Sequence, residues 1–440
     1  MSARPRRLVV VADSDSYVKW GAAFASRLPA GWAAELVLVT TPVLPSERQL
    51  SAALDGTVFS RGAVRRLSLD GLAARLEARR PDAVLLALRG PLVRVVAPIV
   101  GALPERPVIV SGFPGLTIPA EPKAIVYREQ VDLIVLHSRR EVREFRANAL
   151  ALGVPVEFGL ATLPFLSVRD RAFAAARADA PRPDPSAAGG QHGGDLVFAA
   201  QAKVPAERED RVRMLGWLAD AARRRPARRV VVKVRARRGE AQTHAEEHDY
   251  AELLADPEVL DAIGGPPPNL VVLDGPMSRC LEEAAMLVTV SSTAALEAVA
   301  AGVPAVVVDE FGVEPKLINT VFEGSGLLAG ADAIAEWAPR RPEPAWLADN
   351  YFHGEGDDDW ADRLDGLLLL REAGALPFRR RRHNLAGGAL RRAFERKRML
   401  GHYDRSLAGA VSTVVARPAR WVVRRVRLVR RVGASRRLLA

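Results

Sequence analysis

The chain has 440 residues, 49% of them hydrophobic and 26% charged, and a formal net charge of +11. This composition excludes disordered, collagen-like and disulfide-rich chains, and the length predicts two or three packed domains. Because no run of about 18 apolar residues occurs, we expect no transmembrane helix. The short apolar run 8–12 ends at Asp13, which argues against a signal peptide, and the single Cys280 fits a reducing compartment.

In the first part of the chain, short apolar runs alternate with helical patterns. The runs are rich in Val, Ile and Leu and are bounded by turn residues, as is typical of buried strands. Strands are predicted at 8–12, 35–40, 83–88, 107–111 and 132–136, with helices at 18–28 and 138–152. Strands separated by helices favour βαβ units and a parallel sheet.

A stretch rich in Ala, Pro, Asp and Gly follows at 169–194 and reads as a flexible linker. After it the alternation restarts. Strands are predicted at 195–200, 229–234, 269–274, 286–290 and 305–309, with helices at 207–224, 244–255, 277–284 and 293–301.

The predicted fold class is therefore α/β, with two Rossmann-like, doubly wound domains facing a cleft. The boundaries are 1–168 for the first domain, 169–194 for the linker, 195–345 for the second domain and 346–440 for a basic helical C-terminal extension. Ligands of such domains bind beyond the carboxyl ends of the strands, so the residues that follow each strand are the candidates for chemistry.

The most informative segment is VTVSSTAALEAVAAGVP at 288–304, in which a strand runs into Ser291, Ser292 and Thr293 and then into a helix. Hydroxyl residues there can cap the helix, whose first N–H groups and dipole favour a phosphate or diphosphate. Glu297 lies one turn further on and is placed to reach ribose hydroxyls. An ordinary capped βα unit has the same pattern and remains an alternative.

This segment resembles the nucleotide-sugar site of GT-B glycosyltransferases and of related epimerases and transferases of capsule and teichoic-acid synthesis. The stretch 198–328 is similar to an uncharacterised actinobacterial family of proposed glycosyltransferases. The resemblance rests on FAAQ at 198–201, KVR at 233–235, GEAQTH at 239–244, the Ser-Ser-Thr segment and DEFG at 309–312. It implies that the second domain binds the nucleotide-sugar donor and the first domain the acceptor.

Lysine usage gives a separate indication. Only six lysines occur beside 57 arginines, so a retained lysine marks a place that needs a compact charge. Lys203 and Lys233 follow or end second-domain strands, and Lys233 shares a face with Arg235. We expect these cations to neutralise a diphosphate leaving group. Ordinary charges at strand ends are an equal alternative.

Three further second-domain residues are candidates. His244 begins a predicted helix, where it can act as a catalytic acid or bind phosphate, although such residues are often surface caps. Asp309 follows a strand and is expected to contact sugar hydroxyls, with Phe311 beside a base or acceptor, and an ordinary loop is an equal alternative.

In the first domain, Asp13 and Asp15 follow the first strand. Either one is a candidate general base for an acceptor hydroxyl, while a helix cap is the competing interpretation. Ser111 and Gly112 end another strand and are expected to bind the acceptor, because glycine permits close backbone approach. His137 is a further possible base, with a structural role favoured.

No Cys/His cluster has metal-ligand spacing, and neither a Walker A segment nor a Gly-x-Ser-x-Gly elbow is found. The acidic run GEGDDD at 354–359 is interpreted as a solvated loop. We therefore expect no metal and no cofactor, the nucleotide-sugar being a substrate.

The positive charge is concentrated at the C-terminal end. Residues 378–440 carry +17, so the remainder of the chain carries −6. Arginines at 417, 420, 424, 427 and 431 share one helical face opposite a valine-rich face. Such a helix suits an anionic membrane surface. Protein contact remains an alternative, and nucleic-acid binding is disfavoured because no aromatic interleaving or known module is present.

Together these features predict a metal-independent, GT-B-type glycosyltransferase that acts at the cytoplasmic face of the plasma membrane. Its expected partners are a nucleotide-sugar donor, a cell-envelope glycan or lipid-linked acceptor, and the anionic membrane surface bound through 378–440. The alternatives are a teichoic-type glycerophosphotransferase, a nucleotide-sugar epimerase and a catalytically silent binding module.

Overall fold

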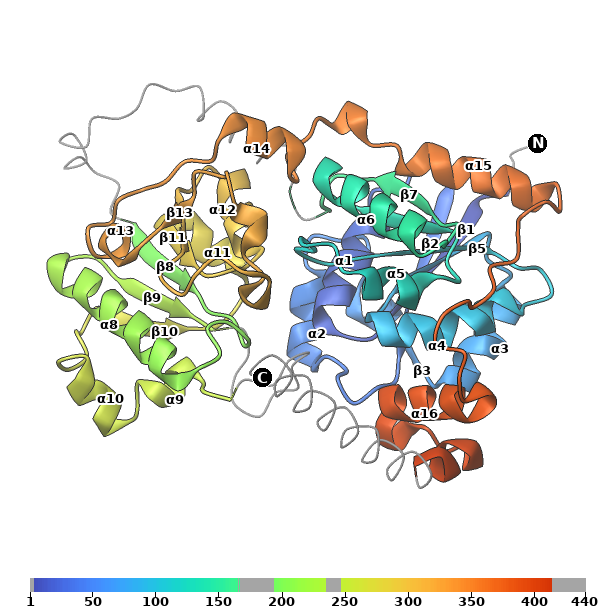
Figure 1. Cartoon of the computed structure of the whole chain (residues 1–440), viewed down its shortest axis with the longest axis horizontal. Coiled ribbons are helices and arrows are strands. Elements are labelled where there is room, and N and C mark those ends of the chain that lie inside the picture. The colour runs from blue at the N-terminus through green and yellow to red at the C-terminus, as the bar shows by residue number, and fades with distance from the viewer. Residues whose placement is uncertain (1–3, 165, 167–193, 235–246, 414–440) are drawn as a thin grey trace, which may run out of the picture.

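The computed structural model describes residues 4–164, 166, 194–234 and 247–413. Two α/β domains lie side by side, with the second domain on the left of Figure 1 and the first on the right. Each domain is built on one parallel sheet, in the strand orders β3-β2-β1-β4-β5-β6-β7 and β10-β9-β8-β11-β12-β13. The expected α/β class with two doubly wound, Rossmann-like domains is confirmed.

The strands of the first domain form a sheet with helices on both faces. Its strands are β1 (Arg6–Ala12), β2 (Trp32–Val39), β3 (Arg65–Leu67), β4 (Ala83–Ala87), β5 (Val108–Gly112), β6 (Leu133–Leu136) and β7 (Glu157–Leu160). Its helices are α1 (Asp15–Ala25), α2 (Glu47–Leu54), α3 (Leu69–Arg79), α4 (Gly90–Gly101), α5 (Pro122–Arg128) and α6 (Arg139–Ala151).

The second domain repeats this plan. Its strands are β8 (Asp195–Ala199), β9 (Val230–Lys233), β10 (Leu270–Leu273), β11 (Ala284–Thr289), β12 (Ala305–Val308) and β13 (Leu328–Ala329). Its helices are α8 (Arg208–Arg224), α9 (Tyr250–Leu253), α10 (Pro257–Ala262), α11 (Met277–Glu282), α12 (Ala294–Ala300), α13 (Ala331–Ala335) and α14 (Pro344–Asp349).

Central strands are apolar along their whole length because both faces of each sheet are covered. Strands β4 and β12 are buried at every residue. The edge strands β3, β7 and β13 were not predicted. Strand β3 is a short Arg-Arg-Leu run with two exposed arginines, and β13 has only two residues, so neither shows the apolar pattern of a buried strand.

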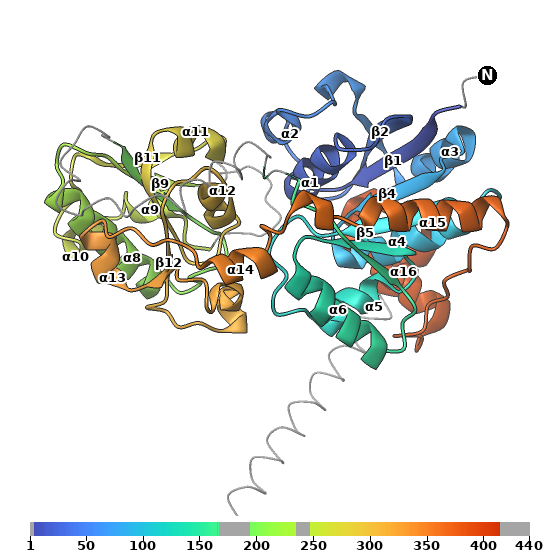
Figure 2. The same ribbon diagram turned by 90° about the horizontal axis from the view of Figure 1, so that it is seen from above.

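The final part of the described chain returns to the first domain. Helix α14 lies between the two domains, and α15 (Trp360–Glu372) runs along the first domain, as Figure 2 shows from above. A Cβ atom on Gly159 of β7 would lie 2.8 Å from the Cα atom of Trp360, so this glycine allows α15 to lie against the sheet. Helix α16 (Gly388–Leu400) then packs against α4.

The residues assigned above to one C-terminal extension thus divide among three places. Trp346 packs in the core of the second domain, Trp360 in the core of the first, and Leu400 beneath α4 and its neighbours. The amphipathic helix expected at 417–431 lies outside the described residues. Within the described part, no helix is both long and apolar enough to span a bilayer.

The last two aspartates of the acidic run at 354–359 anchor this returning segment, so the interpretation as a solvated loop was wrong for them, while Gly354, Gly356 and Asp357 are exposed. The Asp358 carboxylate accepts hydrogen bonds from the backbone N–H and hydroxyl of Thr162, at 2.8 and 3.2 Å, and pairs with His353 at 2.8 Å. Burial alone would raise the pKa of Asp358, but these bonds outweigh it and hold the pKa below its usual value. The density of acidic residues in the sequence suggested exposure to solvent. It gave no indication that backbone N–H groups of Leu160 and Thr162 would bind these carboxylates.

A buried hydrogen bond joins the two domains at the same place. Tyr351, whose ring belongs to the second-domain core, donates its hydroxyl to Glu141 of α6 at 2.7 Å. The Glu141 carboxylate also accepts from the Thr117 hydroxyl at 2.5 Å and from the His137 N–H at 2.8 Å. Burial raises the pKa of Glu141, and these donors oppose the rise. The junction therefore depends on a fully hydrogen-bonded buried carboxyl group.

We predict that Tyr351→Phe lowers the free energy of unfolding by roughly 1–3 kcal/mol, because Glu141 then loses one buried donor. Urea denaturation of the full chain measures the change. Tyr403→Phe, which removes an exposed hydroxyl from the same chain, is the matched control. Equal stability of the two variants would contradict this account of the junction.

Candidate functional site

The candidate site is the junction where the loops that follow the strands of one sheet meet those of the other. Lys19 of α1 pairs with Glu297 of α12, with nitrogen–oxygen distances of 3.2 and 3.3 Å. Arg48 of α2 pairs with Asp274, which follows β10, at 3.1 Å. Since all strands in each sheet are parallel, the carboxyl ends of both sheets are directed to this junction.

On the second-domain side, the Ser-Ser-Thr loop has the geometry of a small polar cradle. Gln201, which follows β8, accepts a hydrogen bond from the Ser291 N–H and donates one to the Ser291 carbonyl, both at 2.8 Å. The Ser291 hydroxyl donates to the Ile318 carbonyl. Ser291 is therefore buried and holds the loop in place.

Ser292 and Thr293 are the accessible members of this loop. The Ser292 hydroxyl accepts from the N–H of Ala294, the first residue of α12, at 3.1 Å, while the N-cap residue is Thr293, whose side chain forms no capping bond. Both residues are partly exposed, and among the described residues their own N–H groups have no hydrogen-bond partner. Helix α12 is only seven residues long, so these N–H groups and the Thr293 hydroxyl matter more here than a macrodipole.

The predicted second-domain cations lie along the same sheet edge. Lys233 ends β9 and is largely buried, while Lys203 is exposed in the turn after β8. Burial raises the pKa of the nearby Cys280 thiol, and the charge of Lys233 opposes this rise. Arg235 and His244 lie outside the described residues.

Asp309 and Phe311 follow β12 and have different surroundings. Asp309 is half-buried, and its backbone ties the loop to Ala329 and Gly312. Phe311 packs on α8, with its ring centroid 5.3 Å from that of Trp217. Its expected contact with a base or acceptor stays a prediction, and its packing on Trp217 was not foreseen from the sequence.

A buried arginine in α8 holds the loop after β8. Arg211 donates to the backbone carbonyls of Gln201 and Ala202, both at 2.9 Å, and to that of Pro205 at 2.9 Å. Its guanidinium lies 4.9 Å from the ring centroid of Tyr250. The loop carrying Gln201 is thus positioned by a residue that sequence reasoning missed, because an arginine within an amphipathic helix gives no separate signal.

On the first-domain side, Asp13 and Asp15 have different environments. Asp13 is fully buried, and its two carboxylate oxygens bind the side chain and the backbone N–H of Arg89, at 2.6 and 3.3 Å. Burial raises the pKa of Asp13, and Arg89 opposes the rise. Asp15 begins α1 and is partly exposed. Of the two, Asp15 is therefore the one that an acceptor can reach.

Ser111 and Gly112 surround a second buried arginine. Arg128 donates to the Ser111 hydroxyl and the Gly112 carbonyl, both at 3.1 Å, and stacks over the ring of Phe113 at 3.9 Å. A Cβ atom on Gly112 would lie 2.5 Å from the indole of Trp20. Both residues are thus buried and occupied by these contacts, and their predicted binding of the acceptor remains a prediction.

His137 is a structural residue in the core. Its Nε2 accepts from the indole N–H of Trp20 at 2.7 Å, so its Nδ1 carries the proton and donates to the Ala161 carbonyl at 2.8 Å. Burial lowers the pKa of His137 to about 4. The neutral ring has no free lone pair with which to accept a proton.

Sequence reasoning also missed Lys19. The scarcity of lysine marked it as one of six, but its place within α1 gave no reason to connect it with the second domain.

No group of three or more His, Cys, Asp or Glu side chains suited to a metal ion occurs among the residues that the structure describes.

Two Rossmann-like domains that meet through the carboxyl ends of their strands define the GT-B class of fold. Residues 8–367 match the model of a family described as "Putative glycosyltransferase (DUF6716)". The chain belongs to this family. Among curated proteins, no match to the sequence is found.

Several solved structures are similar in arrangement. They include a Listeria monocytogenes protein titled a putative UDP-N-acetylglucosamine 2-epimerase (12% identity, 86% of this chain and 99% of that chain, TM-score 0.48). Another is a Neisseria meningitidis UDP-GlcNAc 2-epimerase bound to UDP-GlcNAc (12% identity, 83% of this chain and 99% of that chain, TM-score 0.46). A third is Arabidopsis thaliana UGT89C1 complexed with UDP-L-rhamnose (13% identity, 85% of this chain and 95% of that chain, TM-score 0.43).

We predict that His137 makes stability depend on pH. The folded pKa of about 4 lies below the unfolded value of 6.5, so unfolding takes up a proton as the pH falls through this window. The contribution of the neutral His137 ring to the free energy of unfolding is complete above pH 6.5. It declines by roughly 3 kcal/mol as the pH falls towards 4. Arg27, His353 and Asp358 also act on the ring and remain present in the comparison.

The measurement compares wild type with His137→Gln, whose amide can accept from Trp20 and donate to Ala161 without titrating. Chemical denaturation at pH 7, 5.5 and 4.5 measures the free energy of unfolding. This free energy should fall more steeply with falling pH in wild type than in His137→Gln. His402→Gln, at an exposed position, is the control and should follow wild type. Parallel pH curves for wild type and His137→Gln would refute the assignment.

Proposed function

We propose that this protein transfers a sugar from a nucleotide-activated donor to an acceptor hydroxyl of a cell-envelope glycan or lipid-linked glycan. The single observation that supports this most is the Lys19–Glu297 ion pair across the junction at 3.2 Å. Glu297 lies one turn after Thr293, and Lys19 lies one turn after Asp15. The pair therefore brings the helix that follows the candidate donor loop against the helix that begins at the candidate acceptor carboxylate.

In this proposal the donor diphosphate binds the free N–H groups of Ser292 and Thr293 and the Thr293 hydroxyl, with Lys233 and Arg235 supplying positive charge. Glu297 accepts hydrogen bonds from ribose hydroxyls, exchanging its contact with Lys19 for them. Lys203 and Asp309 flank this edge of the sheet and contact the phosphates and the sugar, respectively. His244 stays a candidate acid.

The chemical step that we propose is direct. The acceptor oxygen attacks the anomeric carbon, the bond from that carbon to the diphosphate oxygen breaks, and the nucleoside diphosphate leaves with both electrons. Asp15 takes the acceptor proton. Asp13 and Arg89 position the start of α1, while Ser111, Gly112 and Arg128 shape the neighbouring acceptor wall. Side-chain and backbone donors stabilise the leaving diphosphate, so the proposal includes no metal or cofactor.

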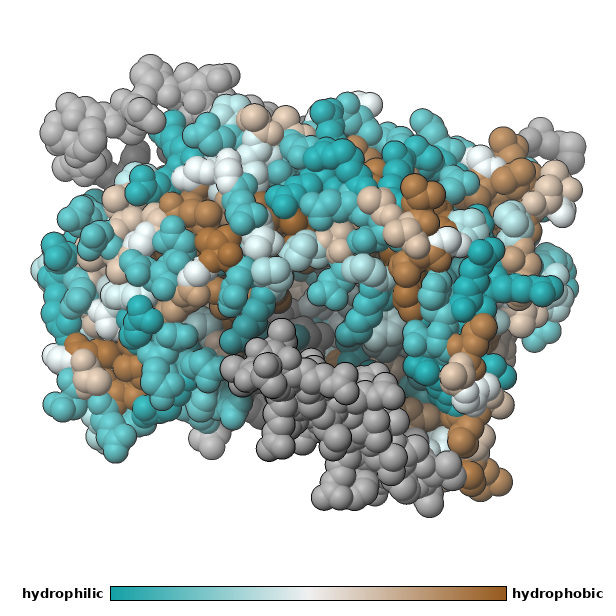
Figure 3. Space-filling view, viewed as in Figure 1, coloured by the Kyte–Doolittle hydropathy of each residue, from teal (hydrophilic) through white to brown (hydrophobic). Residues whose placement is uncertain are grey.

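A location at the cytoplasmic membrane face is part of the proposal. Most of the large apolar side chains exposed in the described structure lie in 378–411, namely Phe378, Leu385, Leu390, Tyr403, Leu407 and Val411. Arginines are interspersed among them, a combination that suits an anionic lipid surface. Figure 3 shows hydrophobic residues at the end of the molecule where α16 lies.

The donor site is tested by thermal-shift and calorimetric titrations with UDP-, GDP-, CMP- and CDP-linked sugars. For the donor that binds, Lys233→Ala and Glu297→Ala should each weaken binding about tenfold or more, because each removes a charged or polar contact worth about 1.4 kcal/mol. Lys316→Ala and Glu336→Ala change the same residue types at exposed positions and serve as matched controls. Survival of binding in both site variants would overturn the donor site.

Asp15→Asn and Asp13→Asn should separate the two carboxylates. We expect Asp15→Asn to lower the transfer rate about 100-fold or more with little change in stability, since it removes a proton acceptor from an accessible position. Asp13→Asn should instead lower the unfolding free energy by roughly 2 kcal/mol, because Arg89 loses its buried partner. Radiolabelled sugar transfer and urea denaturation measure both effects.

Loss of transfer in Asp13→Asn with unchanged stability, beside an active Asp15→Asn, would reverse the assignment. Epimerised donor without transfer would identify an epimerase, and transfer of glycerol phosphate a glycerophosphotransferase. Donor binding without any product would identify a silent binding module.

A further inference from the structure

A pocket of about 310 Å³ lies between α4, α5 and α16. None of its lining residues belongs to the domain junction described above. Helix α4 contributes Arg94, α5 contributes Lys123 and Tyr127, and α16 contributes Arg391 and Arg398. The pocket exists only because the chain returns to the first domain and places α16 against α4.

The charges that line this pocket are unbalanced. Four cations, Arg94, Lys123, Arg391 and Arg398, line it beside a single carboxylate, Glu395. That carboxylate is already neutralised, because Arg381 binds both of its oxygens at 2.9 and 3.1 Å and Arg391 binds it at 3.0 Å. Excess positive charge at one place costs free energy that a bound anion would recover.

Two of the four cations lie on the exposed side of the pocket. Lys123 and Arg398 are exposed, and neither has a carboxylate within ion-pair distance among the described residues. The Lys123 nitrogen lies 5.9 Å from the ring centroid of Tyr127. Their charges are therefore available at the mouth of the pocket.

Arg94 forms the inner wall and has an unused donor. Its side chain is 5% exposed, and its Nε has no hydrogen-bond partner among the described residues. The remaining guanidinium nitrogens lie near the Val126 carbonyl at 2.7 Å, Glu129 at 3.4 Å and Glu395 at 3.7 Å. A buried donor in a pocket wall without a protein partner can bind an acceptor that enters the pocket, whether water or an anion.

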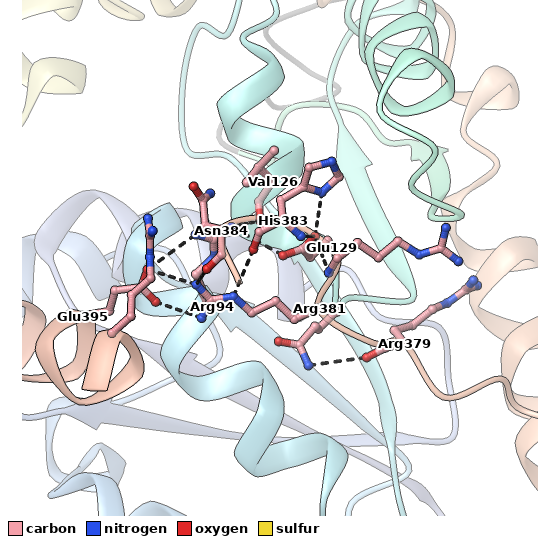
Figure 4. A network of polar contacts seen from close by, with 11 residues as sticks. Arg94, Val126, Glu129, Arg379, Arg381, His383, Asn384 and Glu395 are labelled. Carbon is pink, nitrogen blue, oxygen red and sulfur yellow. Dashed lines mark hydrogen bonds and ion pairs between the residues drawn. The ribbon is translucent and has the colours of Figure 1, made fainter. Parts of the chain in front are cut away.

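The frame around the pocket is fixed by a network of polar contacts that includes Arg94 and Glu395 of its wall, as Figure 4 shows. Glu129 accepts hydrogen bonds from the N–H groups of Arg382 and His383, at 3.0 and 2.9 Å, and from the His383 ring at 2.9 Å. Arg381 donates to the Asn384 carbonyl at 2.8 Å in addition to binding Glu395. These bonds hold the segment before α16 against α5, so the cations are positioned in advance of binding.

We propose that this pocket binds the phosphate group of a phosphorylated ligand, either a small molecule or a lipid headgroup. Arginine and lysine donors are the groups that recognise phosphate, and the volume suits a substituted phosphate. Val126 and Met399 supply an apolar wall beside the cations. The exposed Leu385, Leu390 and Leu407 nearby in the chain favour the lipid source. This site goes beyond the proposed transfer reaction and does not depend on it.

The test uses the full chain in phosphate-free buffer with two probes. Calorimetry with glycerol 3-phosphate reports a soluble ligand, and co-sedimentation with phosphatidylcholine vesicles containing phosphatidic acid reports a lipid headgroup. The double variant Lys123→Gln/Arg398→Gln should bind at least one probe about tenfold or more weakly than wild type, because two charged contacts are lost. If the double variant loses binding of glycerol 3-phosphate alone, the ligand is a soluble phosphate compound. If it loses binding of the vesicles alone, the ligand is a lipid headgroup. If it loses binding of both, the pocket recognises the phosphate group that the two probes share.

The matched control is Arg392→Gln/Arg405→Gln, which removes two exposed charges from the same segment outside the pocket. A conservative pair, Lys123→Arg/Arg398→Lys, should retain binding. Equal weakening in the control pair, or no binding of either probe by wild type, would overturn the proposal. Donor-nucleotide binding should be unchanged in the pocket variant, which separates failure of this site from failure of the donor site.

Discussion

The parallel arrangement of both sheets is the constraint on which the rest of the structure depends. Every parallel strand needs a crossover, so all carboxyl ends of a sheet open onto the same edge. In this chain the two edges face each other, and the loops that begin at Asp13 and Ser291 meet across the junction. Lys19 and Glu297 form their ion pair there because each lies one turn into the helix that follows such a loop.

Loops at a buried sheet edge expose backbone carbonyls that need donors, and this chain supplies buried guanidinium groups for them. Arg128 serves Gly112 in the first domain, and Arg211 serves Gln201, Ala202 and Pro205 in the second. A planar guanidinium has five donors and can satisfy several carbonyls at once. The loops that carry candidate site residues are thereby fixed before any ligand binds.

Arg94 shows the same chemistry with a different outcome. Its guanidinium is also buried, but in the described part of the chain its Nε has no hydrogen-bond partner, and three further cations line the same pocket. The difference is that Arg128 and Arg211 bind backbone carbonyls of their own loops, whereas Arg94 lines a pocket together with three other cations. The surroundings of Arg94 depend on a chain segment that returns from far along the sequence, since Glu395 and Arg381 come from beyond the second domain.

The sequence by itself determined the fold class, the order of the central strands and helices, and the loops in which polar residues follow strands. It could do so because buried parallel strands are uniformly apolar and their ends are marked by Gly, Ser and Asp. Only the tertiary structure decided which of those polar residues remain accessible. Asp13, Ser111 and Ser291 fit the same pattern as Asp15 and Thr293, yet they are buried by Arg89, Arg128 and Gln201. Local patterns record which face of an element is apolar, whereas burial of a polar group depends on a partner distant in the chain. For the same reason, the role of Lys19 and the anchoring by Asp358 were visible only once the two domains and the returning segment were in place.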